Sequence, residues 1–172
     1  MALAEVAQAQ LLSGIFAEAL KEHAPRSVAV LGCAGGNGFT EIDPTITPRV
    51  VGVDINPDYI AQARARFQDR IPALELCVGD IQAEDLVREP VDVIYAALVF
   101  EYVDAGAALD RIRSILNPGG SCILSSAMSL AGWPSIFAKL GWSVEFFCAG
   151  VIPSIHDGAP AACGWCAPSV GA

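Results

Sequence analysis

Positive charge is scarce in this sequence of 172 residues: 10 lysines and arginines stand against 19 aspartates and glutamates, and the net charge is −9 at pH 7. A general nucleic-acid binder contacts the phosphates through clustered Lys and Arg side chains. The basic residues of this chain are scattered along its length. The sequence therefore argues against a general nucleic-acid binder and favours a small uncharged molecule or a protein as partner.

Long hydrophobic runs are also missing. The longest run without charge, Ser114 to Ala138, contains Asn117-Pro118-Gly119-Gly120 and so cannot be one membrane-spanning helix. Near the start of the chain, Glu5 and the neighbouring glutamines interrupt the pattern of a signal peptide. We therefore expect a soluble, cytoplasmic protein with no membrane partner, and its length suits a single domain.

Charge of either sign almost disappears from the end of the chain. Only three charged side chains follow Arg113, fewer than a solvent-facing element normally carries. A short helix is expected over Pro134 to Leu140 and a strand over Trp142 to Cys148. Residues 153–172 show no periodicity and are expected to form an irregular tail. We hypothesise that this end leaves apolar surface open for self-association into a homo-oligomer.

A second pair of metal-binding cysteines is absent. Cys163 and Cys166 have the C-x-x-C spacing of zinc and redox sites, but a structural zinc ion takes four ligands, so Cys148 and His156 would have to complete the set. The strand and helix that flank a thioredoxin-like site are missing as well. We therefore expect no metal. Three further cysteines are interpreted as small apolar residues: Cys33, Cys77 and Cys122.

The chain is organised around the stretch from Val28 to Asp54. An apolar run, Val28–Leu31, leads into a glycine-rich turn, Gly32–Gly38, and a second apolar run, Val50–Val53, stops at Asp54. This order indicates a strand, a turn, a short helix and a strand that ends in an acid. Ligands of open parallel sheets bind outside the carboxyl ends of the strands. Glycine permits close approach of the main chain, and a carboxylate accepts hydrogen bonds from a ribose diol, so a nucleoside-type ligand is predicted.

The spacing of the glycines helps to identify the nucleoside. The dinucleotide fingerprint G-x-G-x-x-G requires glycine where Ala34 stands, which weakens a nicotinamide interpretation. Four segments, LGCAGGNG, VVGVDINPDYIAQARARF, LELCVGDI and LNPGG, occur in the order and at the spacing found in class I S-adenosylmethionine-dependent methyltransferases. From about Val28 to Leu124 the sequence resembles that family.

The resemblance implies an α/β fold, a Rossmann-like doubly wound sheet with strand order 3-2-1-4-5. The family core ends in an antiparallel strand hairpin, of which this sequence offers at most half. The C-terminal hairpin is therefore expected to be incomplete or divergent. Residues 1–26 are expected to form an N-terminal helix, residues 27–152 the S-adenosylmethionine-binding core and residues 153–172 the irregular tail.

The resemblance also implies a site for S-adenosyl-L-methionine, residue by residue. Asp54 would take the ribose hydroxyls, while Gly32 and Gly36 would permit main-chain contact with the amino-acid part. Asp80, after the third strand, would receive the adenine amino group, and the main-chain N–H of Ile81 would meet a ring nitrogen. The remaining expected cofactor contacts are Cys33, Ala34, Ile55, Ala96 and Ala97.

Helices are expected before the first strand and again later in the sequence. Apolar residues at helical spacing between Leu3 and Leu20 predict an amphipathic helix, which either simply covers the sheet or, as in the resembled family, forms a lid over the cofactor. Asn56-Pro57 and Asp104 have the character of helix starts. Three arginines are interpreted as a solvent-side face: Arg64, Arg66 and Arg70.

No catalytic base can be assigned from the sequence. Methyl transfer from a sulfonium rests mainly on alignment and desolvation, and a base is needed only for nucleophiles that stay protonated. The candidates are Glu101, Tyr102 and His156, and the sequence does not identify a group that would orient any of them. The acid that the family often has two residues before the first glycine is Val30 here, which removes a contact to the cofactor's amino group.

Three functional interpretations remain open. The favoured one is an S-adenosylmethionine-dependent methyltransferase that acts on a small-molecule acceptor. A catalytically silent methyltransferase-like module for binding or assembly is supported by the missing acid at Val30 and by the unusual tail. A nicotinamide-dependent oxidoreductase is supported only by the shared order of strand, turn, strand and acid.

Overall fold

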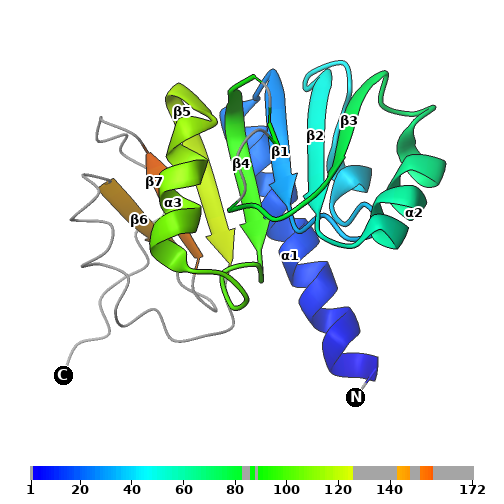
Figure 1. The fold of residues 1–172 in the computed structure, drawn as a ribbon, viewed down its shortest axis with the longest axis horizontal. Helices are drawn as coiled ribbons and strands as arrows, with labels where there is room; N and C mark the ends of the chain where they lie inside the picture. Colours follow the sequence, from blue (N-terminus) through cyan, green and yellow to red (C-terminus); the bar gives the residue numbers. More distant parts are fainter. Residues whose placement is uncertain (1, 83–85, 88, 126–142, 148–151, 157–172) are drawn as a thin grey trace.

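The computed structural model describes residues 2–82, 86–87, 89–125, 143–147 and 152–156, and Figure 1 shows them as one sheet flanked by helices. The helix expected over Pro134 to Leu140 lies outside the described residues. In chain order the elements are α1 (Ala2–His23), β1 (Ser27–Leu31), the 3-10 helix η1 (Phe39–Glu41), β2 (Arg49–Asp54), α2 (Pro57–Phe67), β3 (Ala73–Val78), β4 (Val91–Ala97), α3 (Ala105–Ser114), β5 (Leu116–Ser125), β6 (Ser143–Phe147) and β7 (Ile152–His156).

A sheet with the strand order β3-β2-β1-β4-β5-β7-β6 forms the centre of the described structure. The first five strands of that order run parallel, which confirms the predicted order 3-2-1-4-5. Apart from Ser27 in β1 and Asp92 in β4, these two strands consist of apolar and aromatic residues, as expected for strands that are covered on both faces. The direction of winding reverses between β1 and β4, so their carboxyl ends form the switch point where such sheets bind ligands.

Both strands of the C-terminal hairpin are present. The strand expected over Trp142 to Cys148 is β6, and it pairs antiparallel with β7, which in turn pairs antiparallel with β5. The prediction of an incomplete hairpin and an irregular chain is therefore wrong for residues 153–156. A proline argues against a strand, but the pairing with β5 covers only Ser154–His156, so Pro153 lies outside that ladder. Residues 157–172 lie outside the described part of the chain.

Helices cover both faces of the sheet, as a doubly wound fold requires. Side chains of α1 and α2, among them Phe16 and Phe67, pack into the apolar core on one face. Side chains of α3, among them Leu109 and Ile112, pack into the core on the other face. Figure 1 accordingly shows α1 and α3 on opposite sides of the sheet.

Both predicted helix caps are confirmed. The Asn56 side chain accepts a hydrogen bond from the N–H of Asp58 at 2.9 Å, and Asp104 accepts one from the N–H of Ala107 at 2.8 Å. Each cap satisfies a main-chain N–H that has no partner inside its helix. The caps therefore fix where α2 and α3 begin, just after the loops that leave β2 and β4.

Helix α1 is the predicted N-terminal helix, and it docks on β4. The Phe16 and Tyr95 rings stack with their centroids 4.5 Å apart and their planes 24° from parallel. The Tyr95 hydroxyl donates to the Leu12 carbonyl at 2.9 Å, and burial raises the pKa of Tyr95, so this donor stays neutral. The interpretation as a cover for the sheet is thus confirmed for this part of α1, while a lid role stays a prediction.

Asp92 of β4 joins three strands at the opposite, amino-terminal end of the sheet. Its carboxylate accepts hydrogen bonds from the N–H groups of Arg26 and Ser27 at 2.9 Å, from the Ser27 hydroxyl at 3.0 Å and from the Asn117 amide at 2.8 Å. Burial raises the pKa of the Asp92 carboxyl, but these hydrogen bonds outweigh burial and hold that pKa below its ordinary value of 3.8. The charged form of Asp92 therefore stabilises the starts of β1, β4 and β5.

Candidate functional site

The glycine-rich turn leaves β1 with a backbone that glycine adopts most easily. Gly32 and Gly36 have φ angles of 69° and 91°, in the left-handed region. A Cβ atom on Gly36 would lie 2.5 Å from the Phe67 ring, and one on Gly32 would overlap Val99. Glycine at these two positions makes room for the Phe67 and Val99 side chains, which lie where a Cβ atom would stand.

Asp54 ends β2 and accepts hydrogen bonds from two directions. Its Oδ2 accepts from the N–H of Ala34 at 2.8 Å, and its Oδ1 accepts from the N–H of Asn56 at 2.9 Å. Ala34 has a φ of 45°, which is uncommon for a residue with a side chain, and the bond to Asp54 holds it there. Each carboxylate oxygen has a further lone pair, so both can still accept a hydrogen bond from a diol.

Asp80 stands near Asp54 at the same end of the sheet. Strands β2 and β3 pair in parallel with Asp54 opposite Val78, and the N–H of Gly79 donates to the Asp54 carbonyl at 3.0 Å. The carboxylate of Asp80 accepts from the backbone N–H of Gln82 at 2.9 Å and from its side-chain amide at 3.2 Å. The acids predicted for ribose and adenine therefore follow neighbouring strands.

Exposed apolar side chains accompany these two acids. Ile55 is 71% exposed and Val78 is 50% exposed, although such side chains are usually buried. Ile81 is partly buried and packs against the core under α3. Apolar side chains beside carboxylates form a surface that suits a flat heterocycle with polar edges.

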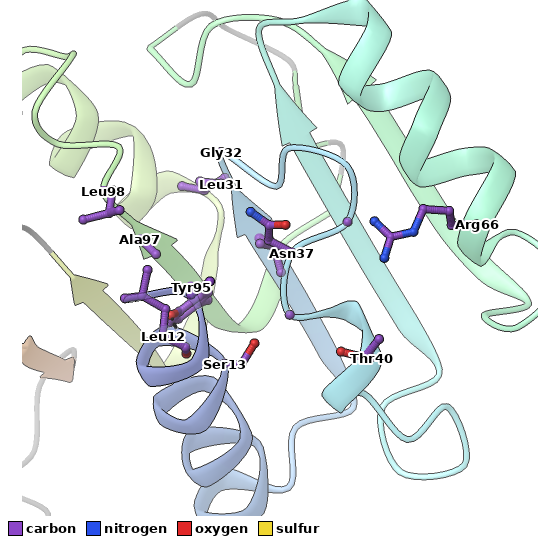
Figure 2. A pocket seen from close by; sticks show the side chains of 14 residues that line it. Leu12, Ser13, Leu31, Gly32, Asn37, Thr40, Arg66, Tyr95, Ala97 and Leu98 are labelled. Atoms are coloured by element: carbon purple, nitrogen blue, oxygen red, sulfur yellow. Dashed lines mark hydrogen bonds between the residues drawn. The ribbon is translucent and has the colours of Figure 1, made fainter. Parts of the chain in front are cut away.

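A cavity of about 310 Å³ opens where β1 and β4 end (Figure 2). Leu12 and Ser13 of α1 bound it on one side, and Ala97 and Leu98 bound it at the exit of β4. Its size falls at the lower end of the range for small-molecule sites. Leu98 has a φ of 59°, and such conformations in large residues concentrate at functional sites.

The predicted cofactor residues fall into groups. Three of them line the cavity: Gly32, Gly36 and Ala97. Four more follow along the ends of β2 and β3: Asp54, Ile55, Asp80 and Ile81. Ala34 connects the two groups through its bond to Asp54. Cys33 and Ala96 are 0% exposed, so neither the side chain nor the main chain of these two residues is accessible to a ligand in this structure.

Cys33 is a packing residue within the turn. Burial, together with the nearby charge of Asp54, raises the pKa of Cys33 to about 12, so its thiol stays protonated at neutral pH. Burial raises the pKa of Cys122 as well. Both are buried free thiols, which confirms their interpretation as small apolar residues.

The three candidate bases are not brought together. Glu101 and Tyr102 lie in the loop between β4 and α3, and Tyr102 is 83% exposed. His156 pairs with Ser121, four residues before the end of β5 at Ser125. At about 3.3 Å per residue, the backbone of His156 lies about 13 Å from the carboxyl end of the sheet. The pairing thus separates His156 from the cavity.

Two arginines, Arg66 in α2 and Arg70 just after it, make contacts that the sequence did not predict. Arg66 donates to the Gly35 carbonyl at 2.6 Å and reaches the cavity lining, and Arg70 donates to the Thr40 carbonyl at 2.7 Å. Both are exposed, as predicted, yet they hold the turn and η1 in place. No local pattern distinguishes an arginine that reaches a distant carbonyl from one that is only solvated.

Metal-binding clusters are absent from the residues that the structure describes, where no group of three or more His, Cys, Asp and Glu could hold an ion. The cysteines of the possible zinc set, Cys148, Cys163 and Cys166, lie outside those residues. Within the same described part of the chain, no helix is both long enough and apolar enough to cross a membrane.

The sheet is doubly wound, and its carboxyl ends carry the glycine turn, two acids on neighbouring strands and the cavity at the switch point. These features define a Rossmann-like domain with a ligand site at the carboxyl ends of its strands. A family model described as a methyltransferase domain matches residues 28–120, which is more than half of the chain. The chain therefore belongs to the methyltransferase-domain family, and its resemblance to class I S-adenosylmethionine-dependent methyltransferases is confirmed.

Relatives of known sequence support this assignment. The chain is 30% identical over 125 residues to an uncharacterized 37.1 kDa protein in transposon Tn4556 of Streptomyces fradiae, covering 71% of this chain and 36% of that protein. It is 33% identical over 110 residues to a trans-aconitate 2-methyltransferase of Methylobacterium radiotolerans, covering 63% and 40%. The chain thus spans well under half the length of these two relatives.

Solved structures share the fold. The N-methyltransferase NodS from Bradyrhizobium japonicum, in complex with S-adenosyl-L-homocysteine, matches with a TM-score of 0.67 at 22% identity, covering 87% of this chain and 84% of that one. The amino pentose methyltransferase CalS10 from Micromonospora echinaspora, with S-adenosylmethionine bound, matches with a TM-score of 0.68 at 15% identity, covering 88% and 90%. At these identities the likeness concerns the fold alone.

Proposed function

We propose that this domain binds S-adenosyl-L-methionine and transfers its methyl group to a small-molecule acceptor. The observation that carries the proposal is the Asp54 carboxylate, which is anchored by the N–H groups of Ala34 and Asn56 and keeps a lone pair on each oxygen. This carboxylate lies between the turn that borders the cavity and the strand that leads to Asp80.

The residues present fit this cofactor. The turn lines the cavity with Gly32 and Gly36, whose main chain a ligand can meet without an intervening side chain. Asp54 would hold the ribose hydroxyls, Asp80 the adenine amino group, and Ile55 would cover a face of the purine. Arg66 is the one formally charged side chain among the described residues that line the cavity.

The cofactor supplies a methyl group on a positively charged sulfur, which is already activated for transfer to a nucleophile. The chain's own contribution is to align the reactants and to exclude water. Leu12, Ala97 and Leu98 give the cavity apolar walls next to the glycine turn. Glu101 and Tyr102 stay candidates for a base, which would be required only by an acceptor that keeps its proton.

A small acceptor is favoured over a macromolecule. The cavity has the size of a small-molecule site, and the net charge of −9 disfavours binding to nucleic-acid phosphates. Relatives that match part of this chain are named for small acceptors or their pathways, among them trans-aconitate 2-methyltransferase and ubiquinone biosynthesis O-methyltransferase. The family assignment leaves the nicotinamide interpretation without support.

Isothermal titration calorimetry tests the proposal. Saturable heat with S-adenosyl-L-methionine and with S-adenosyl-L-homocysteine, and none with NADH, is the expected result. Absence of heat with both sulfur nucleosides would overturn it. Binding of both without methyl transfer to any member of a panel of small carboxylates, phenols and amines would instead favour the silent binding module.

Location and assembly belong to the same proposal. The buried free thiols Cys33 and Cys122 suit a reducing compartment, which supports a cytoplasmic protein. Self-association through the low-charge end of the chain concerns residues that lie mostly outside the described part. Light scattering that returns the mass of a monomer at all concentrations would count against it.

A further inference from the structure

Gln82, in the loop after β3, is hydrogen-bonded in two directions. Its side-chain Nε2 donates to both carboxylate oxygens of Asp80, at 3.2 Å each. Its Oε1 accepts from the N–H of Asp104 at 3.1 Å. Asp104 is the residue that caps α3. A single side chain thus joins the acid that follows β3 to the start of α3.

The segment that ends at Asp104 begins at the cavity. Leu98, its first residue, lines the cavity and donates its N–H to the Ser125 carbonyl at 2.7 Å. The Val99 side chain lies against the Cα of Gly32. The segment Leu98–Asp104 is therefore held by β5 and the glycine turn at one end and by Gln82 at the other.

We propose that Gln82 is a positioning residue that couples recognition of the cofactor's purine at Asp80 to the placement of the segment Leu98–Asp104. The inference rests on the proposed function, because it takes an amino group of the nucleoside to be the donor that meets Asp80. Oδ1 of Asp80 already accepts two hydrogen bonds from Gln82, one from its backbone N–H and one from Nε2, so a nucleoside donor would meet the free lone pair of Oδ2, beside Gln82 Nε2. The amide plane of Gln82 is then fixed, and with it the acceptor that holds Asp104.

Glutamine suits this role because its planar amide carries a donor and an acceptor that point in different directions. The backbone N–H of Gln82 also donates to Asp80, at 2.9 Å, and this bond does not depend on the side chain. Substitution of the side chain can therefore break the link to Asp104 while the local turn at Asp80 persists. This separation makes the inference testable.

Two variants address the two halves of the link. Gln82→Met keeps a side chain of similar length and removes both the donor and the acceptor. Gln82→Glu keeps an acceptor for Asp104 but places a second carboxylate against Asp80, where like charges repel. Gln68→Met is the matched control, because Gln68 is an exposed glutamine at the end of α2, outside the site.

The experiment is hydrogen–deuterium exchange with and without saturating S-adenosyl-L-homocysteine, with calorimetry on the same samples. In wild type and in Gln68→Met, the ligand is expected to slow exchange of amides 99–107 by about fivefold or more, the scale of ordinary coupling between sites. In both Gln82 variants the ligand is expected to bind without this protection, which a merely structural role of Gln82 would not produce.

Two results would overturn the inference. Equal ligand-induced protection of amides 99–107 in wild type and in a folded Gln82 variant would show that the side chain carries no coupling. Binding of the ligand to wild type without any protection of that segment would have the same meaning. If calorimetry shows that S-adenosyl-L-homocysteine does not bind to the wild-type protein, the proposed function itself is refuted and, with it, this inference.

Discussion

Among single residues, Asp54 has two separable tasks. Its hydrogen bonds to the N–H groups of Ala34 and Asn56 hold the glycine turn and the start of α2, while its remaining lone pairs are available to the ribose of the proposed cofactor. An amide at this position keeps an oxygen for one of the two backbone N–H groups and turns its NH2 group toward the other. A substitution to asparagine should therefore weaken the turn as well as ligand binding, and circular dichroism and calorimetry measure the two effects separately.

Asp54→Asn is expected to weaken binding of S-adenosyl-L-homocysteine by at least about tenfold. A hydrogen bond to a charged group contributes roughly 1.5–3 kcal/mol, and about 1.4 kcal/mol corresponds to a factor of ten. Calorimetry gives the affinity, and circular dichroism shows whether the variant is folded. Asp58→Asn, at an exposed acid in the first turn of α2, is the control and should bind like wild type. An unchanged affinity in Asp54→Asn would contradict the role assigned to Asp54.

Gly36→Ala is expected to destabilise the protein by about 2–4 kcal/mol, the sum of a strained backbone and an overpacked contact. The φ of Gly36 is 91°, and the added Cβ would lie 2.5 Å from the Phe67 ring. Urea denaturation measures the free energy of unfolding. Gly14→Ala in α1, where a Cβ meets nothing within 4 Å, should leave stability unchanged or raise it by up to about 1 kcal/mol. Equal effects of the two substitutions would refute this view of the turn.

At the scale of secondary-structure elements, the Asp92 network links stability to pH. The folded protein holds the pKa of Asp92 below the ordinary value of 3.8, so the charged form stabilises the fold. This contribution is fully present above pH 3.8 and is lost as the pH falls through the lower pKa of the folded state.

Asp92→Asn should therefore lower the free energy of unfolding at pH 7 by about 1–3 kcal/mol, because charge-assisted hydrogen bonds are lost. Below about pH 4 the gap to wild type should narrow, since the wild-type carboxyl becomes protonated there. Urea denaturation at a series of pH values measures both effects. A gap that stays constant down to about pH 2 would show that the charge of Asp92 does not stabilise the fold.

Elements that a short stretch of sequence determines could be predicted. Elements and contacts that depend on residues far away in the sequence could not. The caps at Asn56 and Asp104 and the parallel strands follow from capping chemistry and from apolar runs, which sequence displays directly. Strand β7 contains a proline and depends on pairing with β5 and β6. The bond from Arg66 to the Gly35 carbonyl likewise joins residues that are far apart in sequence.

At the scale of the whole molecule, the described structure provides the rim and the cavity of one ligand site. The sequence predicted the glycine turn and both acids, because each stands at the end of an apolar strand. It could not predict the cavity wall from α1, since that wall depends on how Leu12 and Ser13 dock beside Tyr95. The small-molecule methyl acceptor stays a proposal, because this chain covers only 36% and 40% of the lengths of the two relatives that were compared with it.

A crystal structure of this chain with S-adenosyl-L-homocysteine tests the central claim most directly. We predict that both ribose hydroxyls donate to Asp54, that the adenine amino group meets Asp80 and that the amino-acid part enters the cavity beside Gly32 and Ala97. A nucleoside bound elsewhere on the chain, or one that touches neither carboxylate, would contradict the claim that these two acids hold the cofactor.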